Sequence, residues 1–132
     1  MKNRAASLLS VLCVAASLVL SGHAYAMGGK PKTFPIEVKI DFGPAAKPGY
    51  SGTLEIEKGT TPKEAVAQIF PVLLGKACCS LREILAIDGV KIDPAKNYWW
   101  VCLVNGSKKV SPGKRKLKAG DVLEWRYIEE EQ

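Results

Sequence analysis

One helical stretch stands among five strand-like runs, and this order leaves the chain few possible architectures. Alternating apolar and polar residues predict strands over 36–42 and 50–58. Further strands are predicted over 81–87, 98–104 and 122–127. A single helix between the second and third strands cannot cover two sheets, so the simplest packing lays it across one mixed sheet of four or five strands. The predicted fold class is α+β, with the β-grasp arrangement of one helix on one sheet.

The predicted helix has a start signal in Thr61 and Glu64, which are separated by a proline and a lysine. A threonine followed three residues later by glutamate is typical of a capping box, and proline suits the first helical position. An apolar stripe with helical spacing follows within 65–70. We expect the helix to end near Pro71, or to continue briefly to Leu74.

Residues 1–26 are typical of an N-terminal signal peptide. Lys2 and Arg4 precede an apolar run over 5–20, and small residues flank the predicted cleavage point after Ala26. The alternative is a transmembrane anchor, but the run is shorter than the roughly 20 apolar residues that a span needs. We therefore predict a secreted or periplasmic protein.

Cleavage changes which chemistry remains available to the mature chain. The only histidine, His23, leaves with the peptide, and the formal net charge falls from +6 to +4. That modest charge differs from the dense basic stripe of nucleic-acid-binding proteins, so we expect no nucleic-acid partner. A chain without histidine has few groups for acid–base catalysis near neutral pH. We predict no catalytic residues, no metal site and no required cofactor.

Three cysteines remain after cleavage: Cys78, Cys79 and Cys102. In an oxidising compartment, an odd number predicts one bridge with one leftover thiol, or a bond to another chain. Adjacent cysteines rarely bridge each other because the ring is strained. The predicted pair is therefore Cys102 with either Cys78 or Cys79.

The run 98–104 carries the residues that we predict to bind a ligand: Tyr98, Trp99 and Trp100. Neighbours on a strand face opposite sides, so the two tryptophans belong to different faces. Both faces are apolar, which predicts either a central strand covered on both sides or an outer face that meets a partner. An exposed indole offers flat apolar area and an N–H donor, which suits a planar ligand or another protein.

The segment 107–118 is rich in positive charge and in turn-forming residues. One interpretation is a solvated loop that protects an edge strand from pairing with other chains. The other is contact with an anionic surface, such as phospholipid, polysaccharide or an acidic partner. The basic residues concerned are Lys108, Lys109, Lys114, Arg115, Lys116 and Lys118.

Three sequence blocks, in this order, resemble the DUF4430 family: 87–90 (IDGV), 98–106 (YWWVCLVNG) and 117–127 (LKAGDVLEWRY). This family is similar to the C-terminal domain of transcobalamin and intrinsic factor. The resemblance implies a β-grasp fold, secretion and a non-catalytic binding role. In the transcobalamin relatives this domain helps to cover a bound corrinoid beside a large helical domain, so a corrinoid becomes a candidate ligand.

These observations combine into one predicted organisation. A signal peptide (1–26) is followed by a flexible leading segment (27–34), a DUF4430-like domain (35–128) and an acidic tail (129–132). The predicted function is a secreted, non-catalytic module that binds a small planar ligand or another secreted protein through an aromatic sheet face or rim. The alternative is a cell-surface structural domain that assembles through a sheet edge or an intermolecular disulfide.

Overall fold

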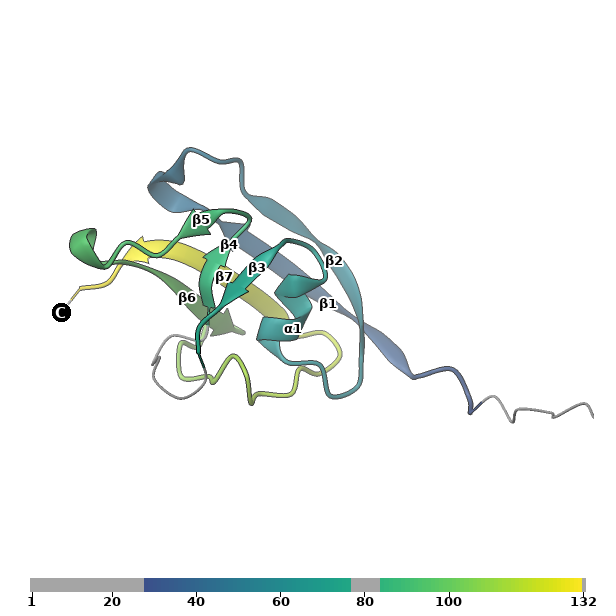
Figure 1. Ribbon diagram of the computed structural model, residues 1–132. Helices are drawn as coiled ribbons and strands as arrows, with labels where there is room; N and C mark the ends of the chain where they lie inside the picture. Colours follow the sequence, from purple (N-terminus) through teal and green to yellow (C-terminus); the bar gives the residue numbers. More distant parts are fainter. Residues whose placement is uncertain (1–27, 77–83, 132) are drawn as a thin grey trace, which may run out of the picture.

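The computed structural model describes residues 28–76 and 84–131. Its main element is a four-stranded mixed sheet in the order β2-β1-β7-β6 (Figure 1). Within the described residues, no helix is both long and apolar enough to cross a membrane. The four strands are β1 (Thr33–Asp41), β2 (Tyr50–Glu57), β6 (Tyr98–Val104) and β7 (Val122–Glu129).

The first and last strands of the chain lie side by side in the middle of this sheet. β1 and β7 run parallel, with Ile40 beside Trp125, whereas β2 pairs antiparallel to β1 and β6 pairs antiparallel to β7. This confirms the predicted mixed sheet and the predicted α+β class. Such a parallel pair needs a long crossover, which the helix and the second layer provide.

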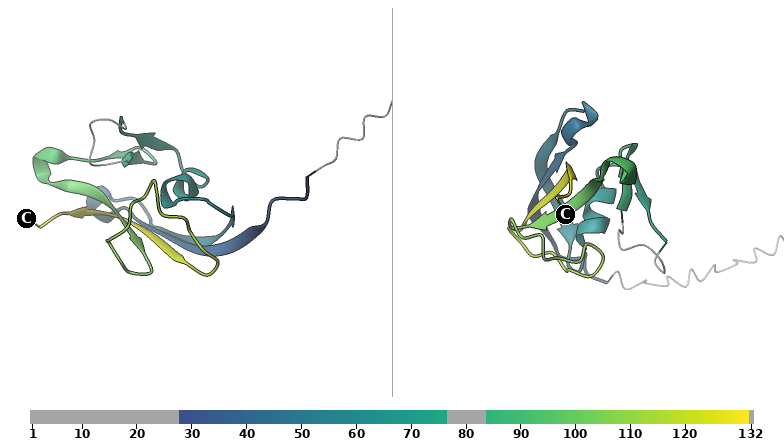
Figure 2. Two further views of the ribbon diagram at one scale, coloured as in Figure 1. Left: turned by 90° about the horizontal axis from the view of Figure 1, so that it is seen from below. Right: turned by 90° about the vertical axis from the view of Figure 1, so that its left-hand side faces the viewer.

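A second layer covers one face of the sheet (Figure 2). It contains the short helix α1 (Pro62–Ala67) and a small antiparallel sheet in the order β3-β4-β5. Two 3₁₀ turns, η1 (Gly43–Ala45) and η2 (Pro94–Lys96), lie in the connections. The small strands are β3 (Val72–Leu74), β4 (Ile84–Ile87) and β5 (Val90–Lys91).

The second layer differs from the predicted covering by a single helix. α1 ends at Ala67, and the predicted extension to Leu74 is wrong because Val72–Leu74 pairs with β4 instead. The strand predicted over 81–87 is present from Ile84 onward, and 81–83 lie outside the described residues. A one-and-a-half-turn helix is too short to cover four strands, so the small sheet shares that task.

The predicted capping box is present at the start of α1. The Thr61 hydroxyl accepts a hydrogen bond from the Glu64 backbone N–H at 3.4 Å, and the Glu64 carboxylate accepts one from the Thr61 N–H at 2.8 Å. These bonds satisfy two donors that a helix start otherwise leaves without partners. They fix where the chain turns from β2 into the second layer.

The core lies between the two layers. Ile36, Val38 and Ile40 alternate inward from β1 and meet Val66 of α1 and Ile87 of β4, all with at most 2% of their surface exposed. Burying each aliphatic side chain of this size contributes about 1.5–3 kcal/mol to folding. The alternation predicted for the first strand is therefore confirmed.

Two aromatic side chains join the layers by hydrogen bonds to the backbone of the β4–β5 unit. The Trp100 indole N–H donates to the Val90 carbonyl at 2.8 Å, and the Tyr127 hydroxyl donates to the Lys91 carbonyl at 2.9 Å. Both rings come from the last two strands of the main sheet. The position of β5 is therefore set by polar contacts as well as by packing.

β6 lies at an edge of the main sheet rather than at its centre. Its faces are as predicted, since Trp100 and Cys102 stand opposite the inward residues Tyr127 and Trp125 of β7. The interpretation of a central strand is wrong because only β7 pairs along its length; single bridges from Asp93 and Ser107 meet its two ends. Its apolar inward face is covered by the second layer.

Candidate functional site

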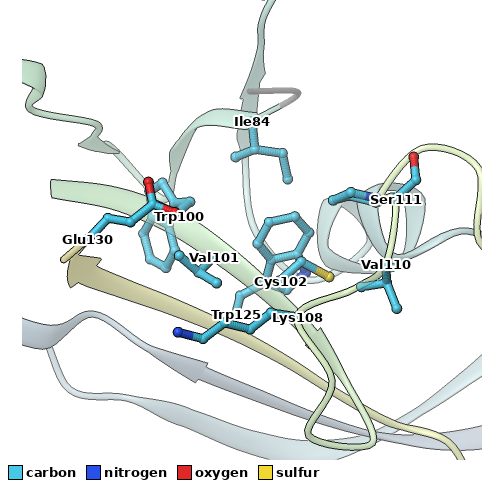
Figure 3. Close-up of a pocket in the computed structure, with 10 residues that line it drawn as sticks. Ile84, Trp100, Val101, Cys102, Lys108, Val110, Ser111, Trp125 and Glu130 are labelled. Atoms are coloured by element: carbon cyan, nitrogen blue, oxygen red, sulfur yellow. The ribbon is translucent and has the colours of Figure 1, made fainter. Parts of the chain in front are cut away.

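A cavity of about 330 Å³ lies beside the outer edge of β6, where the two layers and the 107–118 segment meet (Figure 3). Figure 3 shows Ile84 of β4 across from Cys102 and Trp125, with Val110 and Ser111 along another side. The cavity is at the small end of the range typical of ligand pockets, roughly 300–1,000 Å³. The lining residues are Ile84, Trp100, Val101, Cys102, Lys108, Val110, Ser111, Pro112, Trp125 and Glu130.

The strand register brings two indoles and a thiol into one wall. Trp100 and Cys102 are two residues apart on β6 and therefore share a face. Trp125 of β7 pairs directly with Cys102, which places its ring on the same face. Trp125 is 1% exposed and Trp100 is 4% exposed, so both rings belong to the floor of the cavity.

The two indoles differ in their hydrogen bonding. The Trp100 N–H donates to the Val90 carbonyl, whereas the Trp125 Nε1 is buried and has no hydrogen-bond partner among the described residues. Buried tryptophan N–H groups normally find an acceptor. Within the described part of the chain, Trp125 is therefore a buried donor without an acceptor.

The mouth of the cavity is polar. Lys108, Ser111 and Glu130 are all exposed, while Val110 and Pro112 are half-buried between them and the floor. The cavity therefore has an aromatic floor, an aliphatic middle and a rim with one positive side chain, Lys108, and one negative side chain, Glu130. Such a site can hold a compact apolar group and leave a polar end in water.

Of the three residues predicted to bind a ligand, only Trp100 lines this cavity. Tyr98 is half-buried and stacks on Tyr127, with ring centroids 5.5 Å apart. Trp99 is half-buried on the opposite face of the sheet, where its N–H donates to the Asn97 side chain at 2.8 Å. The strand therefore separates the adjacent tryptophans, and no single surface presents both.

Trp125 was not among the predicted site residues, although it forms the floor together with Trp100. The sequence places Trp125 and Tyr127 on one face of their strand. What it does not contain is the pairing of Cys102 with Trp125, which depends on the register between β6 and β7. That register is the signal that would have identified the second indole.

Of the three cysteines that are candidates for the predicted disulfide, the structure describes only Cys102. Cys102 is buried in the cavity wall. Cys78 and Cys79 lie outside the described residues, so the pairing stays a prediction.

The predicted basic residues spread over the surface of the 107–118 segment. The five lysines are exposed, and Arg115 is half-buried with its guanidinium 4.0 Å from the Asp121 carboxylate. Lys108 reaches the cavity mouth. Lys116 and Lys118 instead border a separate apolar hollow of about 380 Å³ that includes Phe34 and Leu117.

Among the residues that the structure describes, two ionisable side chains have clearly shifted pKa values. Burial raises the pKa of Tyr127, and the nearby Asp93 and Tyr98 raise it further. Hydrogen bonds from the Thr61 backbone and side chain lower the pKa of Glu64, with a further contribution from Lys116 and Lys63. Neither residue lines the β6 cavity.

No model of a protein family and no curated protein matches the chain. Among solved structures, haptocorrin in complex with Cbi matches with a TM-score of 0.63 at 14% sequence identity, covering 77% of this chain. This chain spans only 26% of that haptocorrin chain. The fold is thus similar to that of a part of haptocorrin, and at this identity the likeness shows the fold alone.

A second solved structure matches over almost its full length. It is a protein from Ruminococcus gnavus ATCC 29149, provisionally described as a metal binding protein, with a TM-score of 0.52 and 19% identity over 74% of this chain and 99% of that one. In the part of this chain that the structure describes, no group of three or more His, Cys, Asp or Glu residues could hold a metal ion.

Proposed function

We propose that this chain is a secreted, non-catalytic module of the DUF4430 family that binds a small molecule in the β6 cavity. The observation that carries the proposal is the cavity itself, with two indoles in its floor and a polar mouth. The transcobalamin-like fold supports a binding role. The non-catalytic assignment rests on the sequence, because the predicted mature chain retains no histidine.

The size of the cavity restricts what can enter. A dry cavity of about 150 Å³ holds one benzene ring, so a volume of about 330 Å³ admits a compound of one or two rings. A corrinoid is much larger. It would have to rest across the mouth near Lys108 and Glu130, with only a side group inside. A small planar compound is therefore the first candidate ligand and a corrinoid the second.

Tryptophan emission tests both candidates, since Trp100 and Trp125 line the site. The mature protein is titrated with acetophenone and, separately, with cyanocobalamin, and free tryptophan corrects for absorption by the ligand. We expect saturable quenching with half-saturation below about 1 mM, which corresponds to roughly −4 kcal/mol.

Matched variants locate the binding. Val110→Phe narrows the mouth and should abolish the quenching, whereas Val122→Phe places the same extra volume on the outer face of the sheet and should leave it intact. Absence of saturable quenching by either compound contradicts the proposal. Equal loss in both variants contradicts the assignment to this cavity.

The competing proposal is an assembly domain, and the edge position of β6 favours it. Edge strands expose backbone groups that can pair with another chain. Mass analysis of the secreted protein without reductant distinguishes the two: a disulfide-linked or strand-paired dimer supports assembly, and a monomer at all working concentrations contradicts it.

A further inference from the structure

A second hollow, separate from the β6 cavity, combines an apolar interior with a basic rim. We infer that this Leu117 hollow binds an amphipathic anion, with a short acyl chain or a single ring inside the hollow and one carboxylate among the lysines. The inference goes beyond the proposed function, because the two cavities share no described residue. The interior contains Phe34, Leu117 and Ala119, and the rim carries Lys58, Lys116 and Lys118.

Backbone hydrogen bonds fix the walls of the Leu117 hollow. The Leu117 N–H donates to the Thr60 carbonyl at 2.9 Å, and the Gly120 N–H donates to the Pro35 carbonyl at 3.1 Å. The first bond joins the 116–120 segment to the residue before the α1 cap, and the second joins it to β1. A hollow with walls held in this way exists before a ligand arrives, which lowers the cost of ordering the site on binding.

The interior is apolar and large enough for a chain or a ring. Leu117 is 3% exposed, Phe34 is half-buried, and Ala119 adds a methyl group on the exposed side. A dry cavity of about 150 Å³ holds one benzene ring, so a volume of about 380 Å³ admits a short alkyl chain or a substituted ring. Removal of such a group from water favours its entry.

The lysines of the rim are free of close carboxylate partners. Lys58, Lys116 and Lys118 are exposed, and none of them forms an ion pair with an Asp or Glu in the described part of the chain. Like charges around one small hollow repel each other, and an anion among them removes that repulsion. Lys58 also borders a neighbouring hollow that Glu64 lines, so Lys116 and Lys118 are the pair to change.

The acidic side chains of this region lie elsewhere. Glu55, Glu57 and Glu64 border the neighbouring hollow. The Asp121 carboxylate is buried and accepts a hydrogen bond from the Lys118 backbone N–H at 2.9 Å. Among the described residues, no acidic side chain lines the Leu117 hollow. The charge at its rim therefore favours an anionic headgroup over a neutral or cationic one.

The recessed interior favours a free ligand over a membrane surface. A surface that inserts into a bilayer buries an apolar face among the lipids, which requires apolar side chains that project. Here Leu117 is buried and Phe34 is half-buried, so both line a space instead of projecting from the surface. A single amphipathic molecule matches this shape.

Proton–nitrogen NMR spectra of the mature protein test the inference with probes that differ in one property at a time. Octanoate carries both the chain and the charge, 1-octanol lacks the charge, octylammonium reverses it, and acetate lacks the chain. We expect octanoate, kept below its micelle concentration, to shift the amide signals of Gly59, Leu117 and Ala119 saturably. At low salt it should bind about fivefold more tightly than 1-octanol, and octylammonium should bind more weakly than either.

Two double variants test the role of the charges. Lys116→Gln with Lys118→Gln should weaken octanoate binding about fivefold and leave 1-octanol binding unchanged. Lys39→Gln with Lys91→Gln removes the same charge from positions outside the hollow. This control pair should change octanoate affinity by less than about twofold. Equal weakening in both double variants overturns the assignment of the anion to this rim.

Two single variants test the role of the interior. Ala119→Phe fills the hollow and should abolish the octanoate shift at Leu117, whereas Ala95→Phe places the same ring in η2 and should leave it intact. Both alanines are exposed, so neither change disturbs the core. An octanoate response that persists in Ala119→Phe overturns the inference.

The remaining outcomes separate this site from its alternatives. Equal affinity for octanoate and 1-octanol, or equal shifts by acetate, overturns the inference because the ligand then needs only one of the two features. Octanoate shifts confined to Val101 and Val110 place the binding in the β6 cavity and overturn this site. Retention on anionic vesicles without binding of monomeric octanoate assigns the lysines to a membrane surface and also overturns it.

Failure here is distinguishable from failure of the proposed function. Quenching by acetophenone is read from Trp100 and Trp125 in the β6 cavity, and Ala119→Phe should leave it unchanged. If octanoate fails to bind while acetophenone quenches, only the Leu117 hollow loses its assignment. The reverse result removes the β6 cavity and keeps this inference.

Discussion

The three tryptophan residues of the chain have three different environments. The Trp99 N–H donates to a side chain on the outer face, the Trp100 N–H bonds β6 to β5, and the Trp125 N–H has no acceptor among the described residues. Alternation along a strand predicts which of them share a face, and the structure confirms that separation. The acceptor of the Trp99 N–H lies two residues away, whereas the acceptor of the Trp100 N–H belongs to another strand, a contact that no local pattern predicts.

Glu64 gives a prediction about acid stability. Its pKa is lowered in the folded chain below the ordinary value of 4.5, chiefly by the Thr61 backbone hydrogen bond. The ionised carboxylate therefore stabilises the fold above that value, and the contribution is lost as the pH falls through the folded-state pKa. Denaturant unfolding of the unmodified protein and of Glu64→Gln should differ near pH 7 and converge at acidic pH, once the carboxyl group is protonated in the folded chain as well.

The control for this prediction keeps the glutamate and removes the Thr61 hydroxyl, which bonds both the Glu64 carboxylate and the Glu64 backbone N–H. Glutamine can still accept the Thr61 hydrogen bond but carries no charge, so Glu64→Gln isolates the ionised form. Thr61→Ala removes the cap itself and should cost about 1 kcal/mol at neutral pH. A stability difference between the unmodified protein and Glu64→Gln that stays constant with pH would contradict the assignment.

At the scale of elements, the η1 turn depends on one glycine. Gly43 has a φ of +49°, and a side chain there would collide with the Tyr127 carbonyl oxygen of β7. Gly43→Ala should therefore destabilise the fold by more than about 2 kcal/mol, since strain in the left-handed region and a steric collision add together. Thermal unfolding measures the change.

Gly59 provides the matched comparison for Gly43. It also has a positive φ, of +95°, but open space surrounds the position where a side chain would begin. Gly59→Ala should cost about 1 kcal/mol, the contribution of backbone strain alone. If both variants lose the same stability, the collision with β7 contributes nothing.

Some elements could be predicted from their residues and others could not. The capping box needs only Thr61 and Glu64, which lie within one turn of each other, so it was predictable. The strand Val72–Leu74 was missed because a run of three apolar residues after a helix fits either structure. It becomes a strand through its pairing with Ile84–Ile87, a contact that the local sequence does not contain.

At the scale of the whole molecule, the predicted disulfide is testable through thiol counts. A bridge from Cys102 to Cys78 or Cys79 leaves one reactive thiol in the denatured mature protein. Cys102→Ser should raise that count to two, measured by mass after alkylation without reduction. A count of three in the unmodified protein, or a decrease in the variant, means that Cys102 is not bridged within its own chain.

The basic 107–118 segment carries a prediction about anionic surfaces. Lys116 and Lys118 flank an apolar hollow, so a double change to glutamine should reduce retention on vesicles with anionic headgroups. Lys39→Gln with Lys91→Gln removes the same charge from distant strands. We expect this second pair of changes to reduce vesicle retention clearly less than the first pair. High salt should abolish the retention of the unmodified protein. Equal effects would mean that net charge alone governs retention.

The arrangement of the whole sheet was only partly predictable. The positions of the four strands of the main sheet, the single helix and the α+β class follow from local periodicity, and the structure confirms them, whereas the strands Val72–Leu74 and Val90–Lys91 were not predicted. The edge position of β6 depends on β7 inserting beside β1, a parallel pairing between residues such as Ile40 and Trp125 that are far apart in the chain. Long-range register of this kind also determines the cavity, which explains why its floor was only half predicted.

The adjacency of β1 and β7 has a consequence for the order of events during synthesis. A polypeptide that emerges with its amino end first produces β1 early, yet the partner that shields that strand arrives only with the residues from Val122 onward. Until then the middle of the sheet has a gap, and contacts between distant segments are slow to form. The main sheet therefore closes only after the β7 segment has left the ribosome.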